Sequence, residues 1–254
     1  MSDKTPGGKA PQEHAHQEHP PQEHPPQEHP RQEQALHGNP LDVIVVSDAV
    51  CPWCYVGKRN LEAALASAPD IAARIDWRPF QLDASIPRGG VDRKEYYAKK
   101  FGDRVPEIQK RLDDVGASVG IPFAFDAIRI SPNTLDAHRL IRWAASAGVQ
   151  DKIVERLFRD FFVEGRDIGA ADTLIAAARD CGMDEQLVAR LLASDADAAN
   201  VQGEIAEAQR LGVSGVPFFI FGGRYALSGA QPPQAIAQAM RAAIASVETS
   251  DAKA

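Results

Sequence analysis

The pattern of apolar and polar positions predicts a strand, a helix and a second strand at the start of the folded chain. Residues 41–47 form a short β-branched run, which is typical of a buried strand. After the segment Cys51-Pro-Trp-Cys54, apolar residues recur at helical spacing through residues 61–68, and Pro69 ends that helix. Alternation over residues 75–80 predicts the second strand. Together they form a βαβ unit with the cysteines at the start of its helix.

The middle of the chain carries helical patterns. Residues 92–116 are rich in charge and are predicted to be helical. Four apolar stripes with a period of about 3.6 residues follow. They run through residues 153–162, 174–181, 187–192 and 201–211. Gly182 suits the position just past the end of the second of these helices. No strand pattern is visible between about residues 130 and 212, so we expect a helical insertion here.

The end of the chain returns to strand patterns. Residues 217–221 and 224–228 flank Gly222-Gly223, which predicts a hairpin with a two-glycine turn. Pro232 and Pro233 suit the first turn of a final helix. The buried face of that helix is predicted to carry Ile236, Met240, Ile244 and Val247. The expected fold is therefore α/β, with residues 41–91 and 213–254 forming one domain and residues 92–212 an inserted helical domain.

The first 40 residues have a different composition. They contain eight of the 18 prolines and six of the seven histidines, and a Gln-Glu-His unit recurs there at steps of five. Such a segment buries too little apolar surface to offset its ordering entropy, so we expect disorder. The histidines could collect a soft divalent metal, or the segment could be a solvated extension without a ligand. The candidate metal-binding positions are His14, His16, His19, His24 and His29.

Composition narrows the class of protein. The chain has 254 residues, 44% of them hydrophobic, and a formal net charge of -7, which disfavours a nucleic-acid partner. The most apolar stretch, residues 213–221, is far shorter than the roughly 20 residues of a membrane helix, so we expect no membrane partner. No secretory signal is visible, and we expect a cytoplasmic location. Three cysteines do not make a disulfide-dense scaffold.

The motif Cys51-Pro52-Trp53-Cys54 carries the candidate chemistry. Two thiols one helical turn apart can close a small disulfide or open to a dithiol, and a helix N-terminus stabilises a thiolate. We assign Cys51 as the nucleophile, because it lies outermost, and Cys54 as the thiol that resolves the mixed disulfide. Lys58 and Arg59 add positive charge nearby.

Other uses of the cysteines are less consistent with the chain. A structural zinc site needs four ligands, and the remaining folded candidates are only Cys181 and His138, so no metal or other cofactor is expected. A permanent disulfide is unusual in the expected compartment. Cys181 completes an apolar stripe and is expected to be a small core residue.

The folded part resembles the DsbA-like thioredoxin-fold oxidoreductases and, among them, the FrnE-like dithiol-disulfide isomerase family. The matching stretches are residues 47–59, 77–82, 131–140, 212–219 and 228–233. They run through residues 41–240, nearly all of the chain except its first 40 residues. The resemblance implies a thioredoxin fold interrupted by helices, and thiols or disulfides of proteins or small molecules, glutathione included, as partners. It leaves monomer and dimer open.

The resemblance also implies roles for individual residues. Val216-Pro217 corresponds to a cis-proline loop that faces the cysteines and leaves the Val216 backbone free to pair with an extended substrate. Asp48 corresponds to an acidic position that could assist proton transfer to Cys54, or it could be a turn or capping residue. The stretch with Asn133, Asp136, His138 and Arg139 is expected to lie against the active site. His138 is either a proton donor or a structural histidine bonded to backbone, and the second interpretation is favoured.

Two alternatives stay open. The chain could be a glutathione-dependent isomerase or transferase similar to the kappa class, although such enzymes generally carry Ser at the position of Cys51. It could also be a non-enzymatic protein whose histidine segment binds a metal or a partner. Some FrnE-like proteins have a second cysteine pair, but Cys181 alone cannot form one within this chain. Pro52 and Trp53 do not by themselves set the direction of electron flow.

Overall fold

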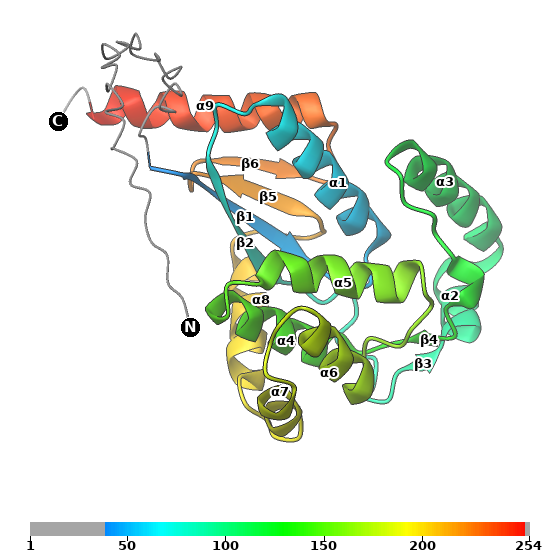
Figure 1. Ribbon diagram of the computed structural model, residues 1–254. Helices are drawn as coiled ribbons and strands as arrows, with labels where there is room; N and C mark the ends of the chain where they lie inside the picture. Colours follow the sequence, from blue (N-terminus) through cyan, green and yellow to red (C-terminus); the bar gives the residue numbers. More distant parts are fainter. Residues whose placement is uncertain (1–38, 252–254) are drawn as a thin grey trace, which may run out of the picture. The chain divides into compact units, whose positions relative to one another are not determined.

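A mixed four-stranded sheet lies at the centre of the computed structural model, which describes residues 39–251 (Figure 1). The strand order is β2-β1-β5-β6. Strand β1 (Leu41–Ser47) pairs in parallel with β2 (Ala73–Pro79) and antiparallel with β5 (Phe218–Phe221), which pairs antiparallel with β6 (Tyr225–Ser228). The strands agree closely with the sequence-based prediction. The tail with its candidate metal-binding histidines lies outside the described residues.

Alternation along β1 explains how the sheet is covered on both faces. Helix α1 (Pro52–Ser67) connects β1 to β2 and packs against α9 (Pro233–Asp251). Val43 and Val45 belong to the main core with these helices, whereas Val46 packs with Phe80 and Val213 in a separate cluster. Because successive side chains of a strand point to opposite faces, this one β-branched strand stabilises both layers.

The segment between β2 and β5 is mostly helical, as expected. It contains α2 (Arg93–Phe101), α3 (Val105–Ser118), α4 (Leu135–Ser146), α5 (Gln150–Phe162), α6 (Ala171–Asp180), α7 (Glu185–Leu192) and α8 (Ala198–Arg210). Two short 3-10 turns also lie in it, at Gly102–Arg104 and Phe125–Ala127.

Three details of the insertion differ from the sequence-based prediction. The charged stretch 92–116 is two helices, because Gly102 adopts a positive φ of 58° and interrupts the first. Strands β3 (Val91–Asp92) and β4 (Ile130–Ser131) form a small antiparallel pair. At two residues each, they are too short to produce an alternation in the sequence. Helix α4 was expected only as part of a general helical segment.

The apolar stripes of the helices are not equally buried. Apolar residues of the α5 stripe are buried, and stacking of Phe158 on Tyr55, with ring centroids 5.0 Å apart, ties α5 to α1. Leu187 and Leu211, from the third and fourth stripes, are instead exposed. Cys181 follows α6 and is half-buried against the core. In α9, Ile236 and Met240 are buried, Ile244 is half-buried, and the side chain of Val247 lies outside the described part.

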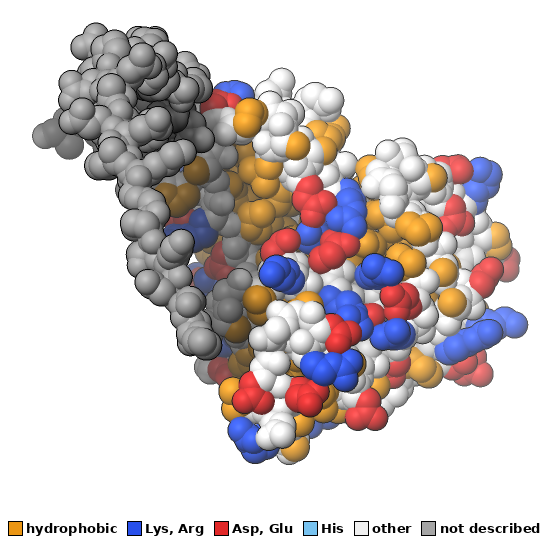
Figure 2. Space-filling model, viewed as in Figure 1, with side chains coloured by type: hydrophobic (Ala, Val, Ile, Leu, Met, Phe, Trp, Pro, Cys, Tyr) orange, Lys and Arg blue, Asp and Glu red, His pale blue; other side chains and the backbone are white. Residues whose placement is uncertain are grey.

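The surface carries both signs of charge. On the face shown in Figure 2, acidic and basic side chains are intermixed and form no continuous basic area. Within residues 39–251, no helix has the length and apolar character needed to cross a membrane.

Candidate active site

Cys51 lies where the chain leaves β1 and enters α1. After Ser47, a turn closes with the Cys51 amide donating to the carbonyl of Asp48 at 3.0 Å. Cys51 is then the residue that precedes the helix, and Pro52 occupies its first turn. Proline fits there because the amides at a helix start have no intrahelical partner. The first turn contains no acidic residue, so the positive end of the helix dipole faces Cys51 without a compensating carboxylate.

The two thiols of the motif have different surroundings. Both are free and buried, with Cys51 4% and Cys54 1% exposed. Cys51 nevertheless lines a cavity, whereas Cys54 is not among its lining residues. Burial raises the pKa of Cys54 well above its usual value, and a hydrogen bond and electrostatic repulsion from Cys51 act in the same direction. Cys51 is therefore the thiol that a substrate in the cavity can contact, and Cys54 is the more buried thiol behind it.

The loop that precedes β5 faces Cys51. The Val216–Pro217 peptide bond is cis, and the Cys51 Sγ lies 3.5 Å from the Val216 carbonyl oxygen, to which the thiol donates. Gly57 in α1 allows this loop to approach, because a Cβ there would lie 2.9 Å from Cγ of Pro217. The absence of a side chain at Gly57 therefore sets how closely the loop packs on the helix.

Asp48 and His138 form a buried pair beside the cysteines. Asp48 is 1% exposed and accepts a hydrogen bond from the Leu82 amide at 2.8 Å. Its other carboxylate oxygen lies 3.3 Å from Nε2 of His138, which comes from α4. The histidine ring therefore contacts a carboxylate rather than the backbone, contrary to the favoured sequence-based interpretation. The Asp48 backbone also belongs to the turn before Cys51, so Asp48 combines a turn position with a buried charge.

Much of the stretch that contains His138 points elsewhere. Arg139 is fully buried and donates to the carbonyls of Leu191, Ser194 and Ala196, and to Asp136. Its interactions hold α4 to the loop after α7. The stretch itself lies against the active site, because Pro132 and Thr134 line the cavity at Cys51 and His138 contacts Asp48. The side chain of Arg139 points away from it, because five donors of a guanidinium need acceptors and the loop after α7 provides them. Asn133 accepts a hydrogen bond from the Leu135 amide at the start of α4, and its side-chain amide donates to the carbonyl of Ile86.

Lys58 and Arg59 do not act as free charges near the cysteines. Lys58 pairs with Glu62 and lies 3.1 Å from Asp151, and Arg59 pairs with Glu62 and Glu155. Burial alone would raise the pKa of Glu155, but the hydrogen bond from Arg59 and the charges of both cations outweigh it, so this pKa is lowered. The sequence correctly placed two cations after the motif, but it could not show the carboxylates from α5 that compensate them.

A cavity of about 460 Å³ opens beside Cys51. The motif, the Val216 loop, α2, α3 and the segment before α4 all contribute to its wall. Aromatic rings of Trp53, Tyr96, Tyr97 and Phe101 line it together with the cations Arg93, Lys100 and Arg111. These α2 and α3 residues are not identifiable from the sequence, because their helices are rich in charge but contain no recognisable motif. A volume of this size is typical of sites for small molecules.

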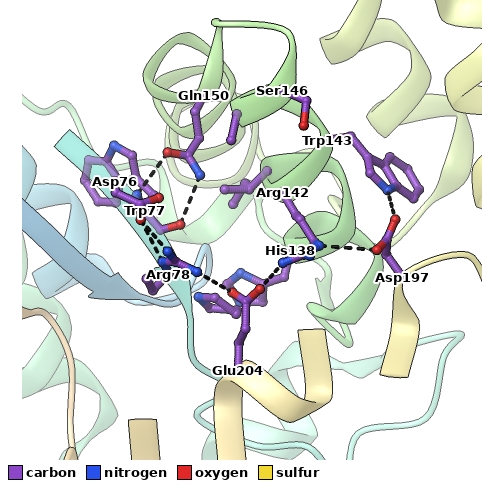
Figure 3. A pocket seen from close by; sticks show the side chains of 13 residues that line it. Asp76, Trp77, Arg78, His138, Arg142, Trp143, Ser146, Gln150, Asp197 and Glu204 are labelled. Carbon is purple, nitrogen blue, oxygen red and sulfur yellow. Dashed lines mark hydrogen bonds and ion pairs between the residues drawn. The ribbon is translucent and has the colours of Figure 1, made fainter. Parts of the chain in front are cut away.

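A second, polar cleft of about 330 Å³ lies on the other side of His138 (Figure 3). Its charged groups are paired with one another: Arg78 with Asp76 and Glu204, and Arg142 with Glu204 and Asp197. His138 lines this cleft while it contacts Asp48, which lines the cavity at Cys51. The Asp48–His138 pair thus connects the two spaces. Within residues 39–251, no group of three His, Cys, Asp or Glu residues is arranged to hold a metal ion.

Comparison with known proteins identifies relatives of the fold. A family model described as DSBA-like thioredoxin domain matches residues 42–241. Uncharacterized protein YwbO of Bacillus subtilis is 29% identical over 140 residues, which is 55% of this chain and 66% of that protein, so the chain spans slightly less than two thirds of this relative.

Solved structures show the same arrangement. A probable DsbA oxidoreductase from Streptomyces coelicolor is 30% identical with a TM-score of 0.74, covering 81% of this chain and 90% of its own. The cytosolic disulfide reductase DsbM of Pseudomonas aeruginosa is 20% identical with a TM-score of 0.55, covering 84% of this chain and 100% of its own, and shares the fold. A separate structure of that protein contains GSH. The thioredoxin fold with inserted helices, expected from the sequence, is thereby confirmed.

Proposed function

We propose that this chain, which belongs to the DSBA-like thioredoxin domain family, is a thiol–disulfide oxidoreductase or isomerase in which Cys51 attacks and Cys54 resolves. The observation that carries the proposal is the placement of Cys51 at the start of α1. There it lines a cavity and lies 3.5 Å from the Val216 carbonyl, while Cys54 lies buried one turn further on. The sequence resemblance supports the narrower assignment to the FrnE-like group.

The reaction follows from the two sulfurs. The Cys51 thiolate attacks one sulfur of a substrate disulfide, so that a Cys51–substrate disulfide forms and the second substrate sulfur leaves as a thiolate. Cys54 then attacks the Cys51 sulfur, the substrate thiolate leaves, and the protein retains the Cys51–Cys54 disulfide. The substrate gains two electrons and the dithiol loses two. The Val216 carbonyl lies beside the reacting sulfur, where an extended substrate segment could pair with the backbone.

Asp48 is the base we propose for Cys54. The resolving thiol is almost fully buried, and its raised pKa makes deprotonation the difficult part of the second step. The backbone of Asp48 acts against burial and lowers the pKa of Cys54, so the main chain of Asp48 is near this thiol. The Asp48 carboxylate would take the proton from Cys54, and His138, which contacts Asp48, would relay a proton toward the polar cleft.

Two single-cysteine variants test the proposal. Cys51→Ser should abolish reduction of insulin and refolding of a scrambled disulfide protein, because no outer sulfur remains to attack. Cys54→Ser should accumulate a covalent mixed disulfide with the substrate, visible as a mass increase that dithiothreitol reverses. Equal activity of Cys51→Ser and the unchanged protein would refute the assignment.

The same variants address the glutathione-dependent alternative. Turnover that needs glutathione and survives in Cys54→Ser would favour a kappa-class-like isomerase or transferase. Glutathione is an expected small-molecule partner, and the GSH-bound structure of the DsbM relative supports testing it. The cytoplasmic location and the division into a thioredoxin-like and a helical domain remain predictions from the sequence.

A further inference from the structure

The cavity beside Cys51 contains a buried cation without a counter-charge. Arg93 is only 6% exposed, yet within residues 39–251 its guanidinium makes no ion pair and no side-chain hydrogen bond. It lies over the Tyr97 ring, 4.0 Å from the ring centroid, with the centroids of Phe125 and Phe161 at 5.8 and 5.9 Å. Aromatic faces attract a cation but do not satisfy its five N–H donors. The guanidinium therefore lacks acceptors among the described residues, and its nitrogens, which are not fully buried, remain open to a group in the cavity.

A second unpartnered group lies in the same cavity. Ser131 is 5% exposed, and its hydroxyl oxygen has no hydrogen-bond partner. The short β3–β4 pair brings the two residues together, because Ser131 is opposite Val91 and the Arg93 amide donates to the Arg129 carbonyl. Buried polar groups are nearly always bonded, so an unbonded buried hydroxyl in the same cavity wall as a guanidinium without an acceptor indicates a missing ligand group.

The charge balance of the cavity shows which group is missing. Lys100 and Arg111, the other cations of its wall, also form no ion pair in the described part of the chain. The acids of the wall are already bonded: Asp83 accepts from Ser85 and Tyr96, and Asp48 from Leu82. In the polar cleft of Figure 3, by contrast, every arginine of the wall pairs with a carboxylate. Lys100 donates to the Tyr96 hydroxyl at 2.8 Å, but the guanidinium groups of Arg93 and Arg111 have no acceptor within the described residues. Three cations thus face two carboxylates in the wall, which complements an anion.

We propose that Arg93 and Ser131 bind the carboxylate of a small organic disulfide whose sulfur lies at Cys51. The aromatic residues of the wall, Trp53, Tyr96, Tyr97 and Phe101, contact its apolar part. The two anchoring groups are buried, so the anion has to enter the cavity, and a volume of about 460 Å³ admits a small molecule. This assignment of a substrate class rests on the proposed function, and the reaction is the one given above: two thiols leave, and the Cys51–Cys54 disulfide forms.

Two chromogenic aromatic disulfides test the proposal: dithiobis(nitrobenzoate), which carries carboxylates, and the smaller dithiodipyridine, which carries none. Each is mixed with the reduced protein in a single turnover, and the ratio of the two rate constants is compared between variants. Arg93→Gln should lower the carboxylate-to-neutral ratio by about tenfold or more, because a charge-assisted hydrogen bond is lost. Arg93→Lys should recover part of the carboxylate-to-neutral ratio, because it keeps the positive charge.

Ser131→Ala guards against misfolding of the Arg93 variants. It deletes a hydroxyl without a partner, so it should leave thermal stability unchanged or raised while it lowers the ratio several-fold. Lys94→Gln is the matched control, since Lys94 follows Arg93 in α2, is exposed, and does not line the cavity. It should leave the ratio within about twofold of the unchanged protein.

The outcomes separate the two proposals. If neither probe is reduced in a Cys51-dependent way, the proposed function fails. If Cys51 reduces both probes but folded Arg93→Gln and Ser131→Ala leave the ratio unchanged, the carboxylate site is refuted and the oxidoreductase stands. If these variants instead impair only reduction of a protein substrate, the cavity binds a protein side chain and the small-molecule assignment is refuted.

Discussion

Substitution of Gly57 by alanine tests whether the packing of α1 against Pro217 positions the active site. At an ordinary helical position, Gly→Ala stabilises a protein by about 0.5–1 kcal/mol. At Gly57 the added Cβ would lie 2.9 Å from Cγ of Pro217 and 3.2 Å from Cζ of Phe219. A proline ring cannot turn aside as a flexible side chain can. Overpacking of this kind costs about 1–3 kcal/mol, so we expect a net destabilisation of about 0–2.5 kcal/mol.

Gly203→Ala is the matched control. Gly203 is also inside a helix, α8, but a Cβ added there would have no neighbouring atom within 4 Å, so only the propensity gain should remain. Urea unfolding of both variants should therefore separate their free energies of unfolding by about 1–3 kcal/mol, with Gly203→Ala the more stable. Because Pro217 must move, the Val216 carbonyl should shift relative to Cys51, and disulfide reduction should slow in Gly57→Ala alone.

Two results would contradict this reasoning. If Gly57→Ala stabilises the protein as much as Gly203→Ala does, the contact with Pro217 is not tight. If Gly57→Ala is destabilised but reduces disulfides at the unchanged rate, the loop position matters for stability and not for the chemistry. A crystal structure of the variant would then show whether Phe219 had moved in place of Pro217.

The remaining predictions concern the proton acceptor, the core and a buried carboxyl. Asp48→Asn should slow resolution of the mixed disulfide by about 100-fold or more, and His138→Asn by less, in stopped-flow release of substrate thiol; equal rates would remove Asp48 as the base. Phe158→Ala should cost about 3–5 kcal/mol in urea unfolding, because its ring is 1% exposed and stacks on Tyr55. Burial raises the pKa of Asp160, so the folded state binds this proton more tightly, and the contribution of Asp160 to stability falls as the pH rises through its folded pKa. Asp160→Asn should accordingly gain stability relative to the unchanged protein as the pH rises from about 4, the usual pKa of an aspartate, through the raised folded pKa, and a constant difference would contradict the assignment.

Short-range patterns in the sequence were sufficient for the four strands of the central sheet and for most helices. A β-branched run predicted β1, the two-glycine turn predicted the β5–β6 hairpin, and periods near 3.6 predicted α5, α6, α7 and α8. Each of these signals depends on neighbours a few positions apart. The two-residue strands β3 and β4 are too short to carry one. Exposure of Leu187 and Leu211 was likewise not visible, because a stripe shows which face is apolar and not what covers it.

The cysteine motif and its place before a helix were readable from the sequence, since a strand, two cysteines and a helix follow one another along the chain. The partners of Cys51 were not readable from local patterns; the family resemblance indicated the Val216-Pro217 loop and Asp48, but not the contact between Asp48 and His138. Val216 lies 165 residues away, and Asp48 and His138 are 90 residues apart. Arg93 and Ser131 come to line the same cavity through the pairing of β3 with β4. Whether each of these side chains has a hydrogen-bond partner depends on which acceptors the tertiary structure places beside it. A hydrogen bond acts over only a few ångströms, so the separation in sequence does not predict it.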